Sequence, residues 1–105
     1  MSPGKLRIKA LQLLGLAHRA GAVRLGTKNV KESVRRGLAC LVLTAEDAAE
    51  GQRDKILPLL AHRGVPHRSV GTRDAIGEAL GRPAVSAVAI EQVGFAERIL
   101  ELMDS

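Results

Sequence analysis

Apolar residues recur along the chain in stretches that alternate between helical and strand-like spacing. A helical stripe runs over residues 3–20, where the cap residue Ser2 precedes Pro3. Short apolar stretches typical of strands follow at residues 23–25, 38–45, 66–70 and 84–90. Helical spacing returns between these stretches and again over residues 95–103. The resulting order, α-β-α-β-α-β-α-β-α, predicts a central sheet between two layers of helices, a three-layer α/β/α sandwich.

Cap residues, glycines and a proline predict where the helices begin and end. Thr27 is expected to cap a second helix that ends at Gly37. A third helix is expected over residues 48–63, and Pro58 should kink or restart it after Leu57. With 105 residues the chain has room for one core, which predicts a single domain over residues 1–105.

The charges are distributed unevenly along the chain. The first forty residues contain nine Lys or Arg and one acid, Glu32, for a formal charge of +8. Residues 41–105 contain seven bases and ten acids, for a charge of −3. The net charge of +5 therefore combines a strongly positive N-terminal part with a slightly negative remainder. The N-terminal part should attract polyanions.

The composition limits how such a chain could bind nucleic acid and where it functions. Phe95 is the only aromatic residue, so no platform exists on which unpaired bases could stack, and we expect recognition of shape, backbone and base edges instead. Cys40 is the only cysteine, which excludes an internal disulfide and a cysteine cluster for zinc. With no signal-peptide pattern or membrane-length apolar run, we expect a cytoplasmic protein without membrane contact.

Several residues could carry catalysis, but none forms a convincing constellation. Cys40 opens an apolar strand, which favours a buried and inert thiol. Glu46 and Asp47 could act as a carboxylate pair in a hydrolase, although Asp47 is also well placed to cap the next helix, the alternative we favour. The histidines lack metal-ligand spacing, and the glycines form no phosphate-binding fingerprint. We therefore expect no enzyme, metal or cofactor.

Residues 26–37 combine several groups suited to binding RNA. Gly26 allows close backbone approach, and Thr27 can bond a phosphate. Lys28 and Asn29 begin the helix, where an Asn side chain can pair with a base edge. The remaining cations of the helix could follow a phosphate backbone: Lys31, Arg35 and Arg36.

Residues 26–37, GTKNVKESVRRG, resemble the signature helix of the ribosomal proteins that bind kink-turn RNA. The similarity continues, in order, through residues 39–48, 57–60, 64–66, 72–77 and 85–90. Two further segments, residues 14–21 and 93–96, are similar to the bacterial YlxQ-like branch of that family. The resemblance covers nearly the whole chain.

The resemblance implies a noncatalytic RNA-binding protein with an α/β/α fold around a small mixed four-stranded sheet. In the family, the turn and the start of the signature helix enter the major groove beside sheared G·A pairs, which corresponds here to residues 26–29 with Glu32 and Arg36. Arg73 lies where the family often has another basic contact. A second, mostly apolar loop covers a flipped-out nucleotide, and its equivalents here are Arg82, Pro83, Ala84, Val85 and Ser86.

Glu32 departs from the family pattern, in which Lys is common at this position. A carboxylate cannot donate a hydrogen bond to guanine O6 or N7, and it would repel phosphate unless Lys28 or Arg36 paired with it.

The leading hypothesis is a monomeric protein that binds structured RNA, either ribosomal or kink-turn-like, with ribosomal proteins as further partners. The alternative is a protein-interaction module that docks on a ribosomal or translation-factor protein without reading RNA. An exposed edge strand at residues 23–25 or 84–90 would leave dimerisation open.

Overall fold

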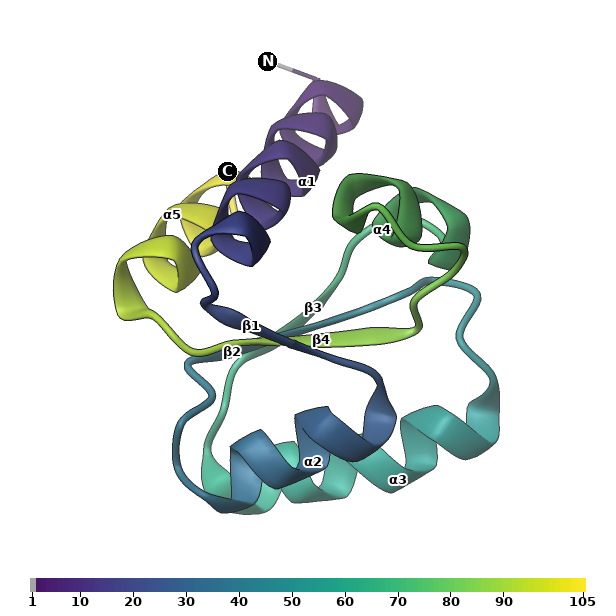
Figure 1. Cartoon of the computed structure of the whole chain (residues 1–105), viewed down its shortest axis with the longest axis vertical. Helices are drawn as coiled ribbons and strands as arrows, with labels where there is room; N and C mark the ends of the chain where they lie inside the picture. Colours follow the sequence, from purple (N-terminus) through teal and green to yellow (C-terminus); the bar gives the residue numbers. More distant parts are fainter. Residues whose placement is uncertain (1) are drawn as a thin grey trace.

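The computed structural model describes residues 2–105 and confirms the predicted alternation of helices and strands (Figure 1). The elements are α1 (Pro3–Arg19), β1 (Val23–Leu25), α2 (Thr27–Arg35), β2 (Leu41–Thr44), α3 (Glu50–Arg63), β3 (His67–Ser69), α4 (Arg73–Leu80), β4 (Ala87–Ile90) and α5 (Val93–Met103). No helix among residues 2–105 combines the length and apolar character needed to cross a bilayer.

The four strands form a mixed sheet in the order β1-β4-β2-β3. β4 is antiparallel to both β1 and β2, whereas β2 and β3 are parallel. The prediction that residues 84–90 could form an exposed edge is therefore wrong, because β4 is paired on both sides. β1 and β3 are the edge strands, and β1 connects directly to α2 through Gly26.

Helices cover both faces of the sheet, α1, α4 and α5 on one and α2 and α3 on the other (Figure 1). Every residue of β2 is buried, as the continuous apolar run predicted. Leu41 and Leu43 pack in the cluster beneath α1, α4 and α5, while Val42 faces α2 and α3. The predicted three-layer sandwich is thus confirmed.

Two helix starts differ from the prediction. Thr27 is the first residue of α2, and the cap position belongs to Gly26, which has no side chain to donate or accept. Ala49 occupies the cap position of α3. Asp47, predicted to cap that helix, instead accepts a hydrogen bond from the backbone N–H of Arg73 (2.8 Å) at the start of α4. Its carboxylate thus lies at a helix N-terminus, but at that of α4.

Pro58 does not interrupt α3, which continues from Glu50 to Arg63. Pro58 lies on the exposed side of the helix, where water can hydrate the carbonyl that its ring leaves without an N–H partner. Ile56 and Leu60 are buried on either side of it. Packing of these side chains outweighs the local cost of the proline.

Candidate nucleic-acid interface

The turn between β1 and α2 depends on the conformation of Gly26. Its dihedral angles, φ 90° and ψ 153°, fall in a region that only glycine adopts readily. The Gly26 N–H donates to the Ala87 carbonyl on β4 (3.0 Å), and its own carbonyl accepts from the N–H of Val30 (2.9 Å). The turn is thereby fixed to the sheet, and the N–H groups of the first turn of α2 are directed out of the helix end.

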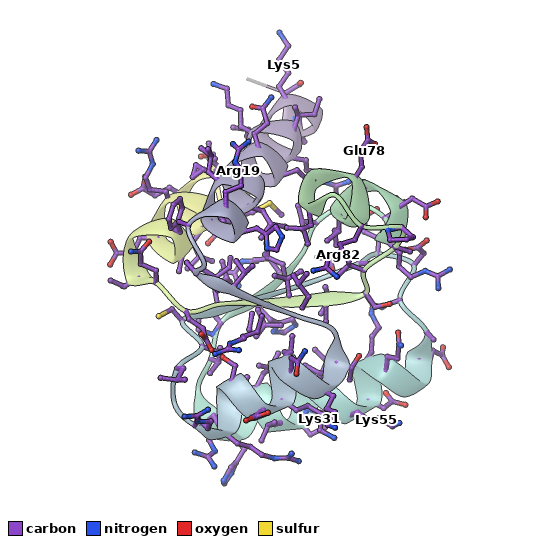
Figure 2. The ribbon with its side chains drawn as sticks, in the orientation of Figure 1. Lys5, Arg19, Lys31, Lys55, Glu78 and Arg82 are labelled. Atoms are coloured by element: carbon purple, nitrogen blue, oxygen red, sulfur yellow. The ribbon has the colours of Figure 1, made fainter. Side chains whose placement is uncertain are left out.

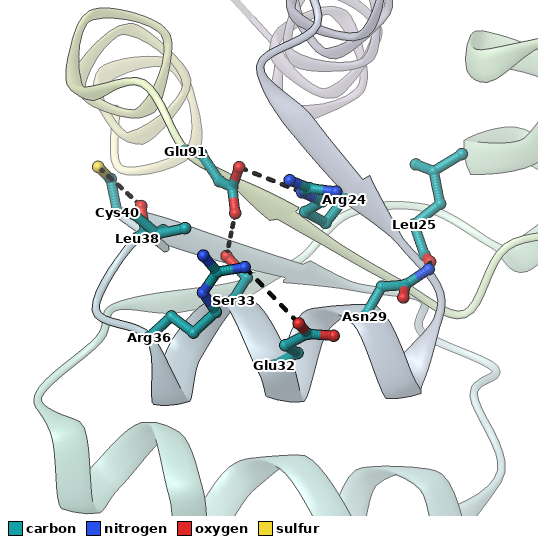
Figure 3. A network of polar contacts seen from close by, with 9 residues as sticks. All are labelled: Arg24, Leu25, Asn29, Glu32, Ser33, Arg36, Leu38, Cys40 and Glu91. Atoms are coloured by element: carbon teal, nitrogen blue, oxygen red, sulfur yellow. Dashed lines mark hydrogen bonds and ion pairs between the residues drawn. The ribbon is translucent and has the colours of Figure 1, made fainter.

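Asn29 stabilises the same turn through its side chain. The amide Nδ2 donates to the carbonyl of Leu25 at 2.9 Å, which ties α2 back to the last residue of β1 (Figure 3). A side-chain amide has a second N–H and an acceptor oxygen. Asn29 can therefore hold the turn and still offer hydrogen-bonding groups to a base edge.

Residues 82–86 link α4 to β4 and are held by backbone hydrogen bonds. The N–H of Arg82 donates to the Gly77 carbonyl (2.7 Å), and the N–H of Val85 donates to the Arg73 carbonyl (3.1 Å). Val85 is buried, whereas Arg82, Pro83 and Ala84 are exposed. The loop thus presents an exposed surface on a fixed backbone.

This loop and the glycine turn line one groove of about 370 Å³, which we call the Gly26 groove. Gly26 and Thr27 form one side, and residues 82–86 contribute from the other. Figure 2 labels Arg82 between α4 and α2. Gln52 of α3 also lines the groove and was not anticipated, since no local pattern distinguishes it from other polar helix residues. The fold therefore brings together the two segments that the resemblance had marked separately.

The cations of α2 that the sequence predicted to contact RNA lie outside this groove. Lys31 is partly buried, and Arg35 is exposed further along the helix. Arg36 lies 3.7 Å from the carboxylate of Glu32, measured from Nη1 to Oε1, and both side chains are largely exposed. Lys28 is exposed at the start of the helix. The pairing of Glu32 with Arg36 meets the condition under which the acid can be accommodated near phosphate.

A polar network that the sequence did not reveal anchors α2 to the sheet (Figure 3). The hydroxyl of Ser33, which is 3% exposed, donates to Glu91 Oε2 at 2.6 Å. Arg24 of β1 lies against the other carboxylate oxygen of Glu91, with Nε 3.3 Å from Oε1. Because Arg24 is half exposed, it adds a cation to the surface beside Asn29 and Arg36. Glu91 follows β4 directly, and only the strand order places it between β1 and α2.

Glu46 and Asp47 face different partners. Glu46 forms an ion pair with Arg7 of α1 (2.7 Å), whereas Asp47 interacts with Arg73 of α4, 3.7 Å from Nε. The two carboxylates thus do not converge on a common point where they could act together. Within residues 2–105, no three His, Cys, Asp or Glu side chains are grouped as metal ligands would be. Arg73 itself is half exposed and does not line the Gly26 groove.

Cys40 is only partly buried, with its sulfur 3.8 Å from the Leu38 carbonyl. The expected full burial is not found: Cys40 precedes β2 and packs, partly buried, against the core beneath α1, α4 and α5.

Comparison with known proteins identifies the relatives of this chain. Residues 8–100 match the family described as ribosomal protein L7Ae/L30e/S12e/Gadd45. "RNA-binding protein YlxQ" of Bacillus subtilis is 36% identical over 92 residues, covering 88% of this chain and 92% of its own length. "Large ribosomal subunit protein eL8" of Haloquadratum walsbyi is 39% identical over 88 residues, covering 83% of this chain and 73% of its own.

Solved structures share the fold. A protein of unknown function from Bacillus halodurans superposes with a TM-score of 0.89 at 31% identity, over 92% of this chain and 98% of its own. The Giardia lamblia 15.5kD RNA binding protein has a TM-score of 0.79 at 24% identity, over 95% of this chain and 86% of its own. At that identity the second likeness is one of fold alone.

Proposed function

Because the chain belongs to the ribosomal protein L7Ae/L30e/S12e/Gadd45 family, we propose that it is a noncatalytic protein that binds structured RNA, ribosomal or kink-turn-like. Its relatives include proteins named for RNA binding and for the large ribosomal subunit. The observation that carries the proposal is the Gly26 groove, where a glycine turn and a helix N-terminus lie opposite an exposed loop. RNA would therefore be read through its shape and backbone.

Each side of the groove contributes a distinct interaction. The N–H groups at the start of α2, with Lys28 beside them, suit a phosphate or a base edge. Across the groove, Pro83 and Ala84 offer an apolar surface for an unstacked base, and Arg82 offers a cation. Arg24 and Arg36 place two exposed guanidinium groups along β1 and α2, each paired with a carboxylate that RNA phosphate could replace. An RNA that bends sharply could contact both sides, whereas a straight duplex would reach only one.

The decisive experiment is a titration of the protein against a kink-turn RNA and a plain duplex of equal length at several salt concentrations. We expect the kink-turn RNA to bind more tightly, and the preference to persist at about 0.2 M salt, where purely electrostatic binding has largely faded. Equal and steeply salt-dependent binding of both RNAs would refute shape recognition. That result would favour the protein-interaction module instead.

A double substitution tests the cations of α2 that lie beside the Gly26 groove. Lys28→Ala with Arg36→Ala should weaken kink-turn RNA binding by at least roughly tenfold and flatten the salt dependence by about one unit for each phosphate that the variant no longer neutralises. Arg63→Ala with Arg98→Ala is the matched control, because it removes two exposed positive charges from α3 and α5. If affinity falls equally in both proteins, overall charge rather than this site governs binding.

A substitution of Glu32 should change RNA affinity in the opposite direction. Its exposed ion pair with Arg36 competes with RNA for the guanidinium group. Glu32→Gln should therefore raise RNA affinity, by roughly two- to fivefold, the range expected for an exposed pair. A loss of affinity would mean that the carboxylate itself contacts the RNA, and the assigned role of Arg36 would be wrong.

A further inference from the structure

A second groove, unrelated to the Gly26 groove in chemistry, runs between α1 and α4. It measures about 810 Å³ and is lined mainly by apolar residues of the two helices. Ile8 and Leu16 lie along it on α1 and are 57% and 48% exposed. Ala75 and Ala79 line it from α4. We call this the α1–α4 groove.

α1 and α4 approach each other closely at Gly15 and Ala79, which both line the α1–α4 groove. A Cβ atom on Gly15 would lie 2.9 Å from the carbonyl oxygen of Ala79, so only glycine permits this approach. The large side chains of Ile8 and Leu16 remain at the side of the contact and are left half exposed. Isolated apolar residues are common on protein surfaces, but two that border one apolar groove form an interaction surface.

Charged residues around the groove indicate what could occupy it. α1 contains Lys5, Arg7, Lys9 and Arg19 and no acidic residue. Arg7 pairs with Glu46 on another side of the helix. Arg19 lines the groove, and Lys5 lies one turn before Ile8 on the same helical face, at the opposite end of α1 (Figure 2). The α1 side of the groove therefore carries positive charge at both ends.

We propose that the α1–α4 groove binds an amphipathic helix of a partner protein, with acidic residues at both ends of its apolar stripe. Helices commonly dock in apolar grooves through residues spaced three and four apart. From Ile8 to Arg19 the groove extends about 16 Å, the length of roughly three helical turns. The acidic ends would meet Lys5 and Arg19, and the apolar stripe would cover Ile8 and Leu16.

Other occupants fit the groove less well. A second copy that paired α1 against α1 would bring the cations of two helices together with no acidic residue on either helix. The acidic residue that lines the groove, Glu78, belongs to α4. RNA would place its phosphates against Ile8 and Leu16, and the groove offers its bases no Phe, Tyr or Trp on which to stack. An acidic helix satisfies the apolar walls and the cations of α1 when its acids lie near the two ends of α1 and away from Glu78 of α4.

Two designed helical peptides of about twelve residues test the proposal. They share one stripe of Leu and carry either Glu or Lys at both ends of that stripe. We expect saturable binding of the Glu peptide, at least roughly tenfold tighter than that of the Lys peptide, measured by fluorescence anisotropy and weakened by salt. Equal binding of the two peptides, or no saturable binding up to about 1 mM, would overturn the proposal.

Paired variants locate the binding. Ile8→Ser with Leu16→Ser should weaken binding of the Glu peptide by at least roughly tenfold while leaving RNA affinity unchanged. The matched control is Leu38→Ser with Val93→Ser, which changes two apolar residues that are 42% and 59% exposed outside the groove. Circular dichroism would verify folding of all variants.

The same variants separate this proposal from the RNA-binding proposal. Loss of RNA affinity in the Ile8 and Leu16 variant would identify RNA as the occupant and refute the helix proposal. Self-association of the unmodified protein, abolished in that variant when measured by sedimentation, would identify a second copy and refute it equally. Peptide binding does not depend on RNA, so either proposal can fail alone.

Discussion

The Gly26 groove and the α1–α4 groove are lined by adjacent residues, yet they offer opposite chemistry. Leu80 and Gly81 line the α1–α4 groove, and residues 82–86 line the Gly26 groove. The chain passes from one to the other at Gly81, the left-handed cap of α4 with φ 69°. The two grooves differ in their opposite wall. In the α1–α4 groove that wall is the exposed face of α1 with Ile8 and Leu16, and in the Gly26 groove it is the N-terminus of α2. The partner element, more than the shared segment, therefore determines what each groove can bind.

Gly77 should be the most sensitive point of this arrangement, because it supports the segment that both grooves share. A Cβ atom there would lie 2.7 Å from the Arg82 carbonyl oxygen and 3.0 Å from two backbone atoms of Ala84. Because backbone atoms cannot rotate away, Gly77→Ala should lower the free energy of unfolding by about 3 kcal/mol, measured by denaturant titration. It should also weaken RNA binding by displacing residues 82–86.

Gly51→Ala is the control for that prediction. Gly51 lies in the first turn of α3 with no atom within 4 Å of an added Cβ. The same substitution should there stabilise the protein by about 0.5–1 kcal/mol, since Ala favours the helix. Equal stability of the two variants would mean that the shared segment is not tightly packed against α4.

Gly26→Ala should disrupt one groove and leave the other intact. An added Cβ would meet no atom within 4 Å, so the effect arises from the backbone angle alone. Strain at this φ should lower the free energy of unfolding by about 2 kcal/mol and weaken RNA binding, while binding of the acidic peptide stays unchanged. Gly64→Ala introduces strain at φ 67° at the end of α3, remote from the turn. If it weakens RNA binding as much, reduced stability rather than the turn is responsible.

Local patterns in the sequence were sufficient to predict the helices and strands. They were not sufficient to predict which residues lie next to one another in the fold. Helices and strands follow from apolar spacing, and resemblance to the family marked both the turn at Gly26 and the loop at residues 82–86. Glu91 escaped prediction because its position depends on pairing between distant strands, and Gln52 because its position depends on how α3 packs beside α2. The cap of α2 was misassigned to Thr27 because the unusual angle of Gly26 cannot be read from its neighbours.

The hydrogen bond between Ser33 and Glu91 distinguishes α2 from α1, because one buried residue of α2 is polar whereas the buried residues of α1 are all apolar. Three buried residues, Val30, Ser33 and Val34, form the inner side of α2. Ser33→Ala should lower the free energy of unfolding by about 1–2 kcal/mol, as expected for removal of a hydrogen bond to a carboxylate. A double-mutant cycle with Glu91→Ala, which removes the acceptor, isolates the interaction. A coupling energy below about 0.5 kcal/mol would show that apolar packing alone positions α2.

The smallest effect is expected at Arg68 and Asp104, which lie in neither groove. Arg68 of the edge strand β3 donates from Nε and Nη2 to the two carboxylate oxygens of Asp104, at 2.8 and 2.9 Å. This hydrogen bonding with Arg68 lowers the pKa of Asp104 below its ordinary value of 3.8. Its contribution to stability should therefore be complete above the ordinary pKa and disappear as pH falls through the lowered one.

Asp104→Asn measures that contribution. The unmodified protein should be slightly more stable than the variant at pH 6, and the difference should vanish in strong acid, where Asp104 is protonated. The pair is exposed to solvent, so the difference at pH 6 should be small, and binding of both RNA and peptide should not change. Glu101→Gln, a neutral substitution of an exposed acid on α5, is the control. A stability difference between Asp104→Asn and the unmodified protein that is the same at both pH values would contradict the ion-pair explanation, because only ionised Asp104 can form the pair.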